Sequence, residues 1–236
     1  MSKKYKNEVC AYCGITPVNG DHTSDHVFSR EFFLVNRRDN LPQVPACRRC
    51  NKEKSDLEHY LTTVLPFGGH HVDSKSNLSQ MVPKRLKGNL KLSREIAKEK
   101  RKDYVKCENG LYLPMSTLNF DSIKLEKLNE YIARGLTWFH WKKNSANSQV
   151  VTYVAYGDEI EIPIVYTIDN FFKNSYDTEV VESNLGNGAV IYKGVGNKED
   201  YSQSIWEINI YGIKFLDTRK KIAKINNPRI FTIVSE

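Results

Sequence analysis

An aspartate and a histidine stand side by side in the stretch TSDHVFSR, residues 23–30. A carboxylate such as Asp25 can hold a divalent cation, and the imidazole of His26 can take a proton from water because its pKa lies near neutrality. The cation can also neutralise charge on a phosphate and on the oxygen that leaves it. The pair could therefore hydrolyse a phosphodiester. The alternative is a surface turn at Asp25 followed by a strand in which His26 belongs to the core.

Two cysteine pairs flank this stretch, Cys10 with Cys13 and Cys47 with Cys50. Each pair has the two-residue gap that lets both thiolates reach one ion, and two pairs complete a tetrahedral zinc site. Disulfides are the alternative, but the first ten residues lack the apolar run of a signal peptide, so we expect a reducing compartment. We predict one structural zinc ion per chain and an unpaired thiol at Cys107.

The 33 residues between the two pairs exceed the roughly 15–20 of a plain zinc ribbon. The insert carries Asp25, His26 and Asn40, and Asn51 follows Cys50 directly. Asn40 lies in RDNLP, which is also an ordinary turn sequence. Asn51 could instead cap the helix that begins after the second cysteine pair.

The pattern C-x-x-C … DHV … DNLPQVPACRRCNKEKS resembles the zinc-knuckle form of the HNH endonuclease family. The order of its DH, DN and N-x-x-K-S motifs is also similar to that in the HNH domain of RNA-guided DNA nucleases. The match covers residues 10 to about 60. The resemblance implies a ββα-metal core, a hairpin packed on a helix, with His26 as general base. It implies that Asp25 and Asn51 hold a catalytic Mg²⁺ or Mn²⁺, and that Asn40 shapes the hairpin loop and positions His26.

Two positions depart from many relatives in the family. Ser29 stands where proline is common, and Asn51 stands where histidine is common, which makes this an H-N-N variant and bears on its metal preference. Neighbouring strand residues point to opposite faces. Asp25 and His26 can therefore serve one site only if the strand bends or twists, as the distorted hairpin of the family does.

The net charge of +7 is concentrated in one segment. Residues 84–106 hold 10 Lys and Arg against 3 Asp and Glu, whereas the segments on either side are nearly balanced. Such a run is either a solvated helix face or a surface that follows nucleic-acid phosphates, and beside a nuclease motif we favour the second. The candidate nucleic-acid-binding residues are Arg48, Arg49, Lys52, Lys54, Lys98, Lys100, Arg101 and Lys102.

The elements that must position these residues suggest an α+β chain in three parts. The resemblance implies that residues 1–65 form an HNH nuclease domain with its zinc knuckle. Residues 66–106 form a linker, rich in Gly, Ser and Pro over 66–84, and a basic helical segment over 85–105. Residues 107–236 form an α+β domain of unknown role. There an apolar stripe with three- and four-residue spacing predicts a helix over 122–141. Alternating residues then predict an antiparallel sheet that includes a hairpin turning at Gly157-Asp158 and strands within 188–194, 204–215 and 229–234.

Composition places the chain among ordinary globular proteins, with 40% hydrophobic and 27% charged residues. No stretch approaches the roughly 18 apolar residues of a membrane span. We therefore expect a cytoplasmic protein with DNA as its partner and no membrane contact, and the C-terminal domain is a candidate for contacting another protein or a second copy. The first hypothesis is a metal-dependent DNA endonuclease, by analogy a bacterial or phage restriction or defence enzyme. The second is a catalytically silent zinc module that binds nucleic acid.

Overall fold

A two-stranded antiparallel hairpin that leads into a long helix forms the first part of the structure. In this computed structural model, β1 (His22–His26) pairs with β2 (Gln43–Cys47), and His26 lies directly opposite Gln43. Helix α1 (Arg48–Val64) begins at the residue after β2. Two short 3-10 turns, η1 (Arg30–Phe32) and η2 (Val35–Arg37), lie within the connection between the strands. The structure describes residues 5, 8–18, 20–106, 109–118, 121–155, 177–212, 215–216, 225–226 and 229–235.

The segment predicted as a linker, 66–84, is mainly helical, which corrects that prediction. Asp73 is fully buried and accepts a hydrogen bond from Arg37 Nη1 at 2.7 Å, and the side-chain amide of Asn77 donates to Tyr211 Oη at 2.9 Å. Because these polar groups find partners inside the protein, a polar composition conceals a packed segment. The elements here are η3 (Leu65–Gly68), α2 (Val72–Gln80), α3 (Val82–Gly88) and α4 (Leu90–Glu99).

The basic segment predicted as helical over 85–105 is helical only as far as Glu99. From there the chain continues as β3 (Lys100–Lys106), which pairs antiparallel with β4 (Tyr112–Leu118). The pairing depends on a partner strand later in the chain, which the local run of Lys and Arg does not reveal. The predicted basic helix is therefore wrong in its last third.

The C-terminal part is an antiparallel sheet with a helix packed against it, as predicted. Helix α5 (Ser122–Trp141) has the predicted bounds, begins at the capping side chain of Asp121 and buries its leucine and isoleucine stripe. The five-stranded sheet has the order β5-β11-β8-β7-β6, and β9 (Phe215–Leu216) pairs with β10 (Ile225–Asn226). The strands of the sheet are β5 (Gln149–Ala155), β6 (Thr178–Leu185), β7 (Val190–Asn197), β8 (Ser204–Ile210) and β11 (Arg229–Ser235).

Four of the five strands match the sequence prediction and one was missed. β5 corresponds to the first strand of the predicted hairpin. β7, β8 and β11 correspond to the segments 188–194, 204–215 and 229–234, whereas β6 was not anticipated. The predicted hairpin turn at Gly157-Asp158 lies outside the described residues, as does Cys107.

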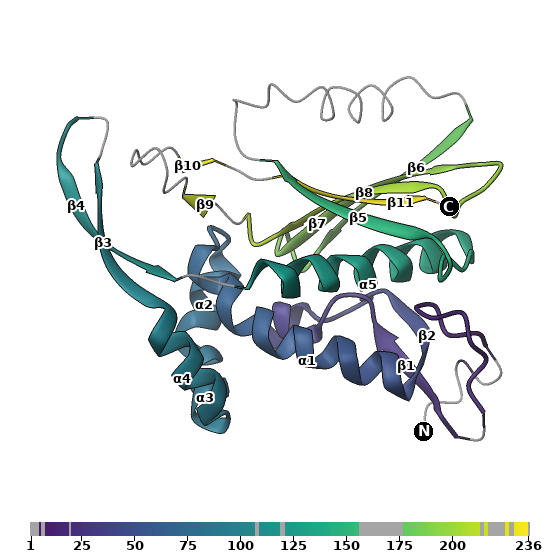
Figure 1. Cartoon of the computed structure of the whole chain (residues 1–236), viewed down its shortest axis with the longest axis horizontal. Helices are drawn as coiled ribbons and strands as arrows, with labels where there is room; N and C mark the ends of the chain where they lie inside the picture. Colours follow the sequence, from purple (N-terminus) through teal and green to yellow (C-terminus); the bar gives the residue numbers. More distant parts are fainter. Residues whose placement is uncertain are drawn as a thin grey trace.

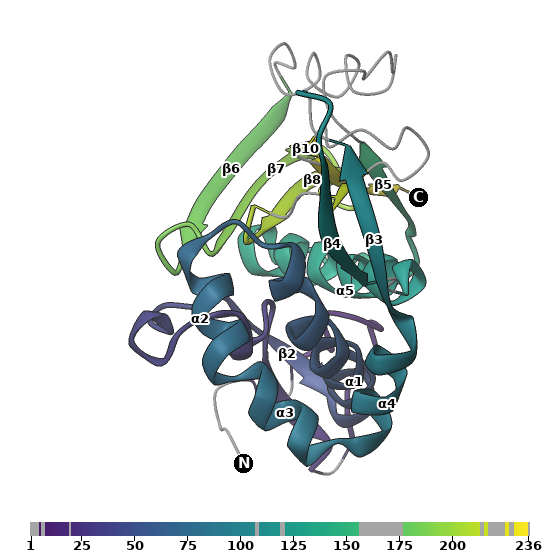
Figure 2. The ribbon, with the colours of Figure 1, turned by 90° about the vertical axis from the view of Figure 1, so that its left-hand side faces the viewer.

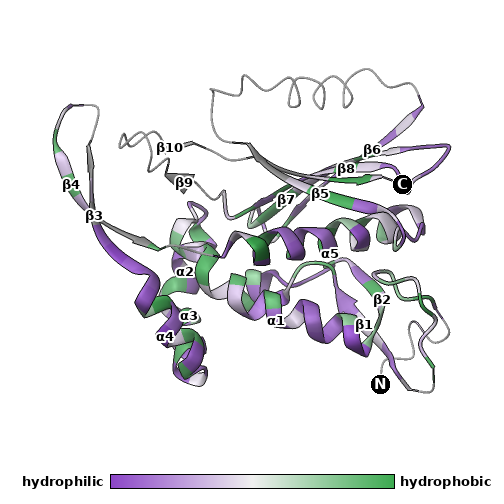
Figure 3. Cartoon of the chain, viewed as in Figure 1, coloured by the Kyte–Doolittle hydropathy of each residue, from purple (hydrophilic) through white to green (hydrophobic). Residues whose placement is uncertain are grey.

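Helix α5 lies between the sheet on one side and α1 with the β1–β2 hairpin on the other (Figure 1). Apolar residues gather where α5 faces these layers, and polar residues dominate α3, α4 and the start of β3 (Figure 3). One cluster of buried side chains extends from Cys10 to Val234, so the N- and C-terminal parts share a core. Gly135 permits the close approach of α5 to the hairpin, because a Cβ there would lie 3.1 Å from Val27 Cγ2. Among the described residues, no helix is long and apolar enough to cross a membrane.

Candidate metal centre and carboxylate–histidine site

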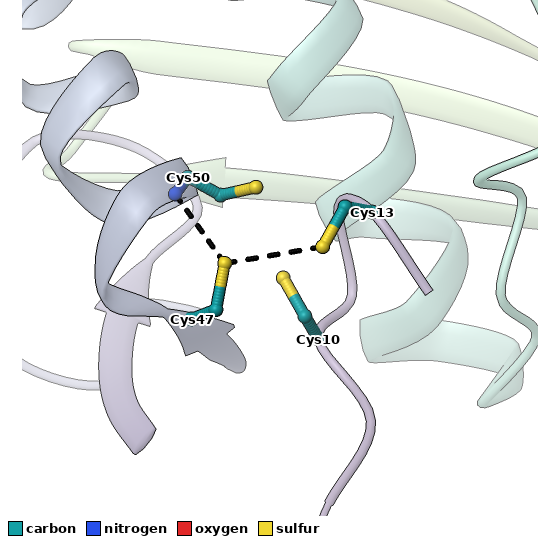
Figure 4. Close-up of side chains that lie close together, drawn as sticks. All are labelled: Cys10, Cys13, Cys47 and Cys50. Carbon is teal, nitrogen blue, oxygen red and sulfur yellow. Dashed lines mark hydrogen bonds between the residues drawn. The ribbon is translucent and has the colours of Figure 1, made fainter. Parts of the chain in front are cut away.

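The four cysteines of the two pairs converge at the start of helix α1 (Figure 4). Their Sγ atoms all lie within 4.8 Å of one another, and Cys13 Sγ and Cys47 Sγ are 3.9 Å apart. A disulfide would need about 2.05 Å, whereas thiolates at about 2.3 Å from a zinc ion lie roughly 3.8 Å apart in a tetrahedron. All four are free thiols, so the cluster could hold a metal ion such as zinc.

Local backbone structure brings the thiols together. Cys10 N–H bonds Ile15 O at 3.0 Å and Gly14 N–H bonds Cys10 O at 2.9 Å, in a turn that closes through Gly14 at φ +70°. Cys50 N–H points at Cys47 Sγ at 3.4 Å, which places the second pair on the first turn of α1. The hydrogen bond with the Cys50 side chain is the main cause that lowers the pKa of Cys10 to about 5. A thiolate ready to bind a metal is thereby favoured at Cys10.

Asp25 lies on the face of β1 that packs against helix α1. Its Oδ2 accepts a hydrogen bond from Tyr12 Oη at 2.6 Å and lies 3.1 Å from Lys54 Nζ. The side chain of Asp25 is only 12% exposed. The carboxylate is therefore held in place by one neutral and one cationic donor from two different elements.

Lys54 is fully buried and is the centre of an oxygen-lined site. Its ammonium contacts the carboxylates of Asp25 and Glu58 and donates to the backbone carbonyl of His26 at 2.7 Å. Burial alone would lower the pKa of Lys54, but the attraction of the two carboxylates outweighs it and raises the pKa. Burial raises the pKa of Glu58 to about 7, because the charge of Lys54 offsets only part of the cost of desolvation.

This burial corrects the expectation that Lys54 contacts phosphate. An ammonium that is 0% exposed and surrounded by two carboxylates and a carbonyl is not available to a nucleic-acid backbone. Its position instead fixes the end of β1 against α1, because the same group contacts both Asp25 and the carbonyl of the next residue.

The imidazole of His26 meets the opposite strand. Its Nε2 lies 2.8 Å from the Nε2 of Gln43, its direct cross-strand partner. Ser24, two residues earlier on the same face of β1, donates to Gln43 Oε1 at 3.4 Å. Asp25 and His26 thus follow the alternation of a regular strand: the carboxylate contacts groups on α1 and the imidazole contacts Gln43. The bend that was expected to bring both side chains to one site is not a feature of β1 here.

Asn51 shares the β1–α1 interface with Asp25. Its Nδ2 donates to Thr23 Oγ1 at 3.0 Å, two residues before Asp25 on the same face of the strand. Its Oδ1 is the atom that could bind a cation, because carboxylate and amide oxygens are the ligands that Mg²⁺ prefers. Asn40 is exposed in the turn before β2 with φ +55°, a left-handed conformation that asparagine tolerates.

Three of the predicted phosphate contacts lie together at the N-terminal end of α1. Arg48, Arg49 and Lys52 are exposed there, and Arg48 pairs with Asp21 at 3.3 Å. Helix N-termini favour anions, so this end of α1 suits a phosphate. Lys98 is exposed on α4, and the remaining predicted contacts, Lys100, Arg101 and Lys102, are exposed on β3.

Three residues of the site were missed from the sequence: Tyr12, Gln43 and Glu58. Glu58 follows Lys54 by four residues, a spacing that signals an ion pair on a helix. Tyr12 lies inside CAYC and gives no such signal, and Gln43 is recognised only once the strand register is known.

Comparisons of this chain with family models, curated proteins and solved structures found no match.

Proposed function

We propose that this protein is a metal-dependent DNA endonuclease of the HNH type. The observation that carries the proposal is that Asn51 on α1 bonds Thr23, two residues before Asp25 on β1, in a hairpin-helix unit that carries Asp25-His26 and begins beside a four-cysteine cluster. A module that only binds nucleic acid has no need of a base next to a carboxylate.

The four cysteines would hold a structural zinc ion. The cluster joins the segment before β1 to the junction of β2 and α1, so a bound ion would fix the two ends of the insert relative to each other. Four thiolates satisfy zinc without an open position, which is the pattern of a structural and not a catalytic site.

In the proposed reaction, His26 removes a proton from water, the water oxygen bonds to phosphorus and the P–O bond to the leaving alkoxide breaks. Asp25 and Asn51 would hold Mg²⁺ or Mn²⁺, which supplies charge neutralisation at the phosphate and the leaving oxygen. The base requires a free imidazole lone pair. Because Gln43 Oε1 accepts from Ser24 and Gln43 Nε2 faces His26 Nε2, the imidazole would have to release Gln43 before Nε2 takes the proton.

A catalytically silent zinc module that binds nucleic acid is the second candidate. It is favoured by the engagement of Asp25, whose Oδ2 already contacts the ammonium of Lys54 and the hydroxyl of Tyr12. A carboxylate neutralised in this way has a structural role without any metal. The nuclease proposal requires that a cation binds Asp25 through its other oxygen or alongside Lys54. It also requires that the end of β1 twists when metal or DNA binds, so that His26, which contacts Gln43 here, turns towards the same site.

Metal-dependent cleavage separates the two candidates. Purified, zinc-loaded protein is incubated with plasmid, linear and single-stranded DNA in Mg²⁺ or Mn²⁺, and cleavage that EDTA abolishes supports the nuclease. Asp25→Ala and Asn51→Ala should lose cleavage and recover part of it at high Mg²⁺ or Mn²⁺, because they weaken metal binding. DNA binding without cleavage on any substrate would favour the silent module.

A further inference from the structure

The β3–β4 hairpin extends away from the rest of the protein. It lies at the end of the molecule opposite the β1–β2 hairpin, and its two strands pack on each other and not on the five-stranded sheet (Figure 1). In the perpendicular view it rises beyond α4 as a separate ribbon (Figure 2). Each strand has seven residues, so the ribbon is about 23 Å long at about 3.3 Å per residue.

One face of this ribbon combines positive charge with aromatic rings. Lys100, Lys102 and Tyr104 occupy alternate positions of β3 and therefore share a face. Tyr112 on β4 pairs with position 106, two residues beyond Tyr104, so it belongs to the same face. Both lysines are exposed, and the two tyrosines are 65% and 62% exposed.

The positive charge continues from the ribbon onto the adjoining helices. α4 buries Leu92 and Ile96 and exposes Lys91, Arg94 and Lys98. α3 exposes Lys84 and Lys87. The ribbon thus adjoins two helices that expose further positive charge.

We propose that the β3–β4 hairpin is a DNA-binding ribbon whose lysine- and tyrosine-bearing face lies in a groove of duplex DNA. The inference rests on the proposed function and specifies how the substrate would be held. The major groove, about 12 Å wide, admits a two-stranded β-ribbon. Lysines on that face reach phosphates at the groove edges, and the tyrosines contribute apolar contact and hydroxyl donors to base edges or sugars.

Duplex DNA fits the ribbon better than the two other occupants that its chemistry suggests. Single strands are usually bound in a groove that follows the backbone, whereas this hairpin is an arm. A second copy of the chain could add to a free strand edge, but Pro114 removes a donor from β4 and lysines on β3 oppose such pairing.

The test compares two pairs of lysine substitutions in the full-length, zinc-loaded protein. Lys100→Ala/Lys102→Ala removes two charges from the ribbon. Lys127→Ala/Lys198→Ala removes two exposed charges from α5 and the loop after β7 and serves as the matched control. Affinity for a 20-bp duplex is measured over a range of salt concentrations without added Mg²⁺, so that no cleavage intervenes.

We expect the ribbon variant to lower the slope of log K against log salt by roughly 2, since each phosphate contact contributes about 0.9. Its duplex affinity should fall roughly tenfold or more at physiological salt, and the control should match the wild type. Tyr104→Ala/Tyr112→Ala should weaken duplex binding several-fold with an unchanged slope, because no charge is lost. Zinc content and thermal stability should stay at wild-type values, since all four side chains are exposed.

The proposal would be overturned if Lys100→Ala/Lys102→Ala bound duplex DNA as tightly as the control variant. It would also be overturned if the tyrosine variant lost only its binding to single-stranded DNA, or if the wild type had no affinity for duplex DNA. Cleavage keeps this test separate from the nuclease proposal. If the wild type cuts DNA and the ribbon variants bind DNA normally, the proposal that the β3–β4 hairpin binds DNA is refuted and the nuclease proposal is supported. If the ribbon variants lose DNA binding but the wild type does not cut DNA, the proposal that the hairpin binds DNA is supported and the nuclease proposal is refuted.

Discussion

Lys54 is the buried charge on which the β1–α1 interface depends, and replacing it with methionine should destabilise the whole protein. Methionine keeps most of the length and apolar volume of the side chain but removes the ammonium. Asp25 and Glu58 then lose their shared cation, and the carbonyl of His26 loses its donor at 2.7 Å. The side chains of both acids are only 12% exposed, so water does not replace the lost contacts.

The size of the stability loss in Lys54→Met follows from the burial of the charged groups around position 54. Breaking a buried pair by removing one partner typically costs about 3–5 kcal/mol, because the remaining charge stays desolvated. Glu58 limits the cost by taking up a proton, since burial has already raised its pKa to about 7. Lys54→Met/Glu58→Gln replaces that carboxyl with a neutral amide and should recover the cost of protonating it, at most about 1.4 kcal/mol at pH 8, which is one pH unit above a pKa of about 7.

Urea denaturation of the zinc-loaded protein, followed by far-UV circular dichroism at pH 8, measures these differences. Lys52→Met is the matched control, because Lys52 lies two residues away on the same helix and is exposed. It should change the free energy of unfolding by less than about 0.5 kcal/mol. If Lys54→Met were as stable as Lys52→Met, Lys54 would not hold the interface together and the reasoning on this site would be refuted.

Three further predictions concern pH, zinc and packing. Because the pKa of Glu58 is raised to about 7 from its ordinary 4.5, the folded protein keeps a proton that the unfolded chain releases between these values. Stability should therefore fall by roughly 3 kcal/mol as the pH rises through this window. Glu58→Gln should remove that part of the dependence, and equal pH profiles for the two proteins would contradict it. Metal analysis should find one zinc ion per chain. Cys10→Ser or Cys47→Ser should lose this zinc ion and unfold the N-terminal region. Wild-type protein that is folded but contains no zinc would refute the prediction. Gly194→Ala should lower the free energy of unfolding by about 1–3 kcal/mol, because the new Cβ would lie 2.2 Å from Trp206 Cζ3. Gly88→Ala is the control, since its new Cβ would meet no atom within 4 Å. Equal unfolding midpoints for these two variants would contradict the close packing of Gly194 on Trp206.

The sequence predicts best where local periodicity and local motifs determine the structure. The apolar stripe of α5 gives its bounds, and the two C-x-x-C motifs identify the four thiols that converge. Both features depend on residues a few positions apart. The exposed positions of Arg48, Arg49 and Lys52 also follow from the polar sequence at the start of α1.

Prediction fails where a distant partner decides the outcome. Asp73 and Asn77 suggest a loop until Arg37 and Tyr211 are seen to pair with them. Lys54 suggests a surface cation until Asp25, from another element, is placed beside it. Lys100–Lys106 continues a basic helix in sequence and becomes a strand only through pairing with Tyr112–Leu118.

Cleavage by His26→Ala tests the nuclease proposal most directly. Single-turnover cleavage of DNA in Mg²⁺ is compared among the wild type, His26→Ala and His59→Ala, the last an exposed histidine on α1. Loss of a positioned base should slow cleavage by roughly 10²–10⁴-fold in His26→Ala, with zinc content and DNA affinity unchanged and no rescue by high Mg²⁺. His59→Ala should cut at the wild-type rate. A folded, zinc-loaded His26→Ala protein that cuts DNA as fast as the wild type would contradict the account and remove His26 from the reaction.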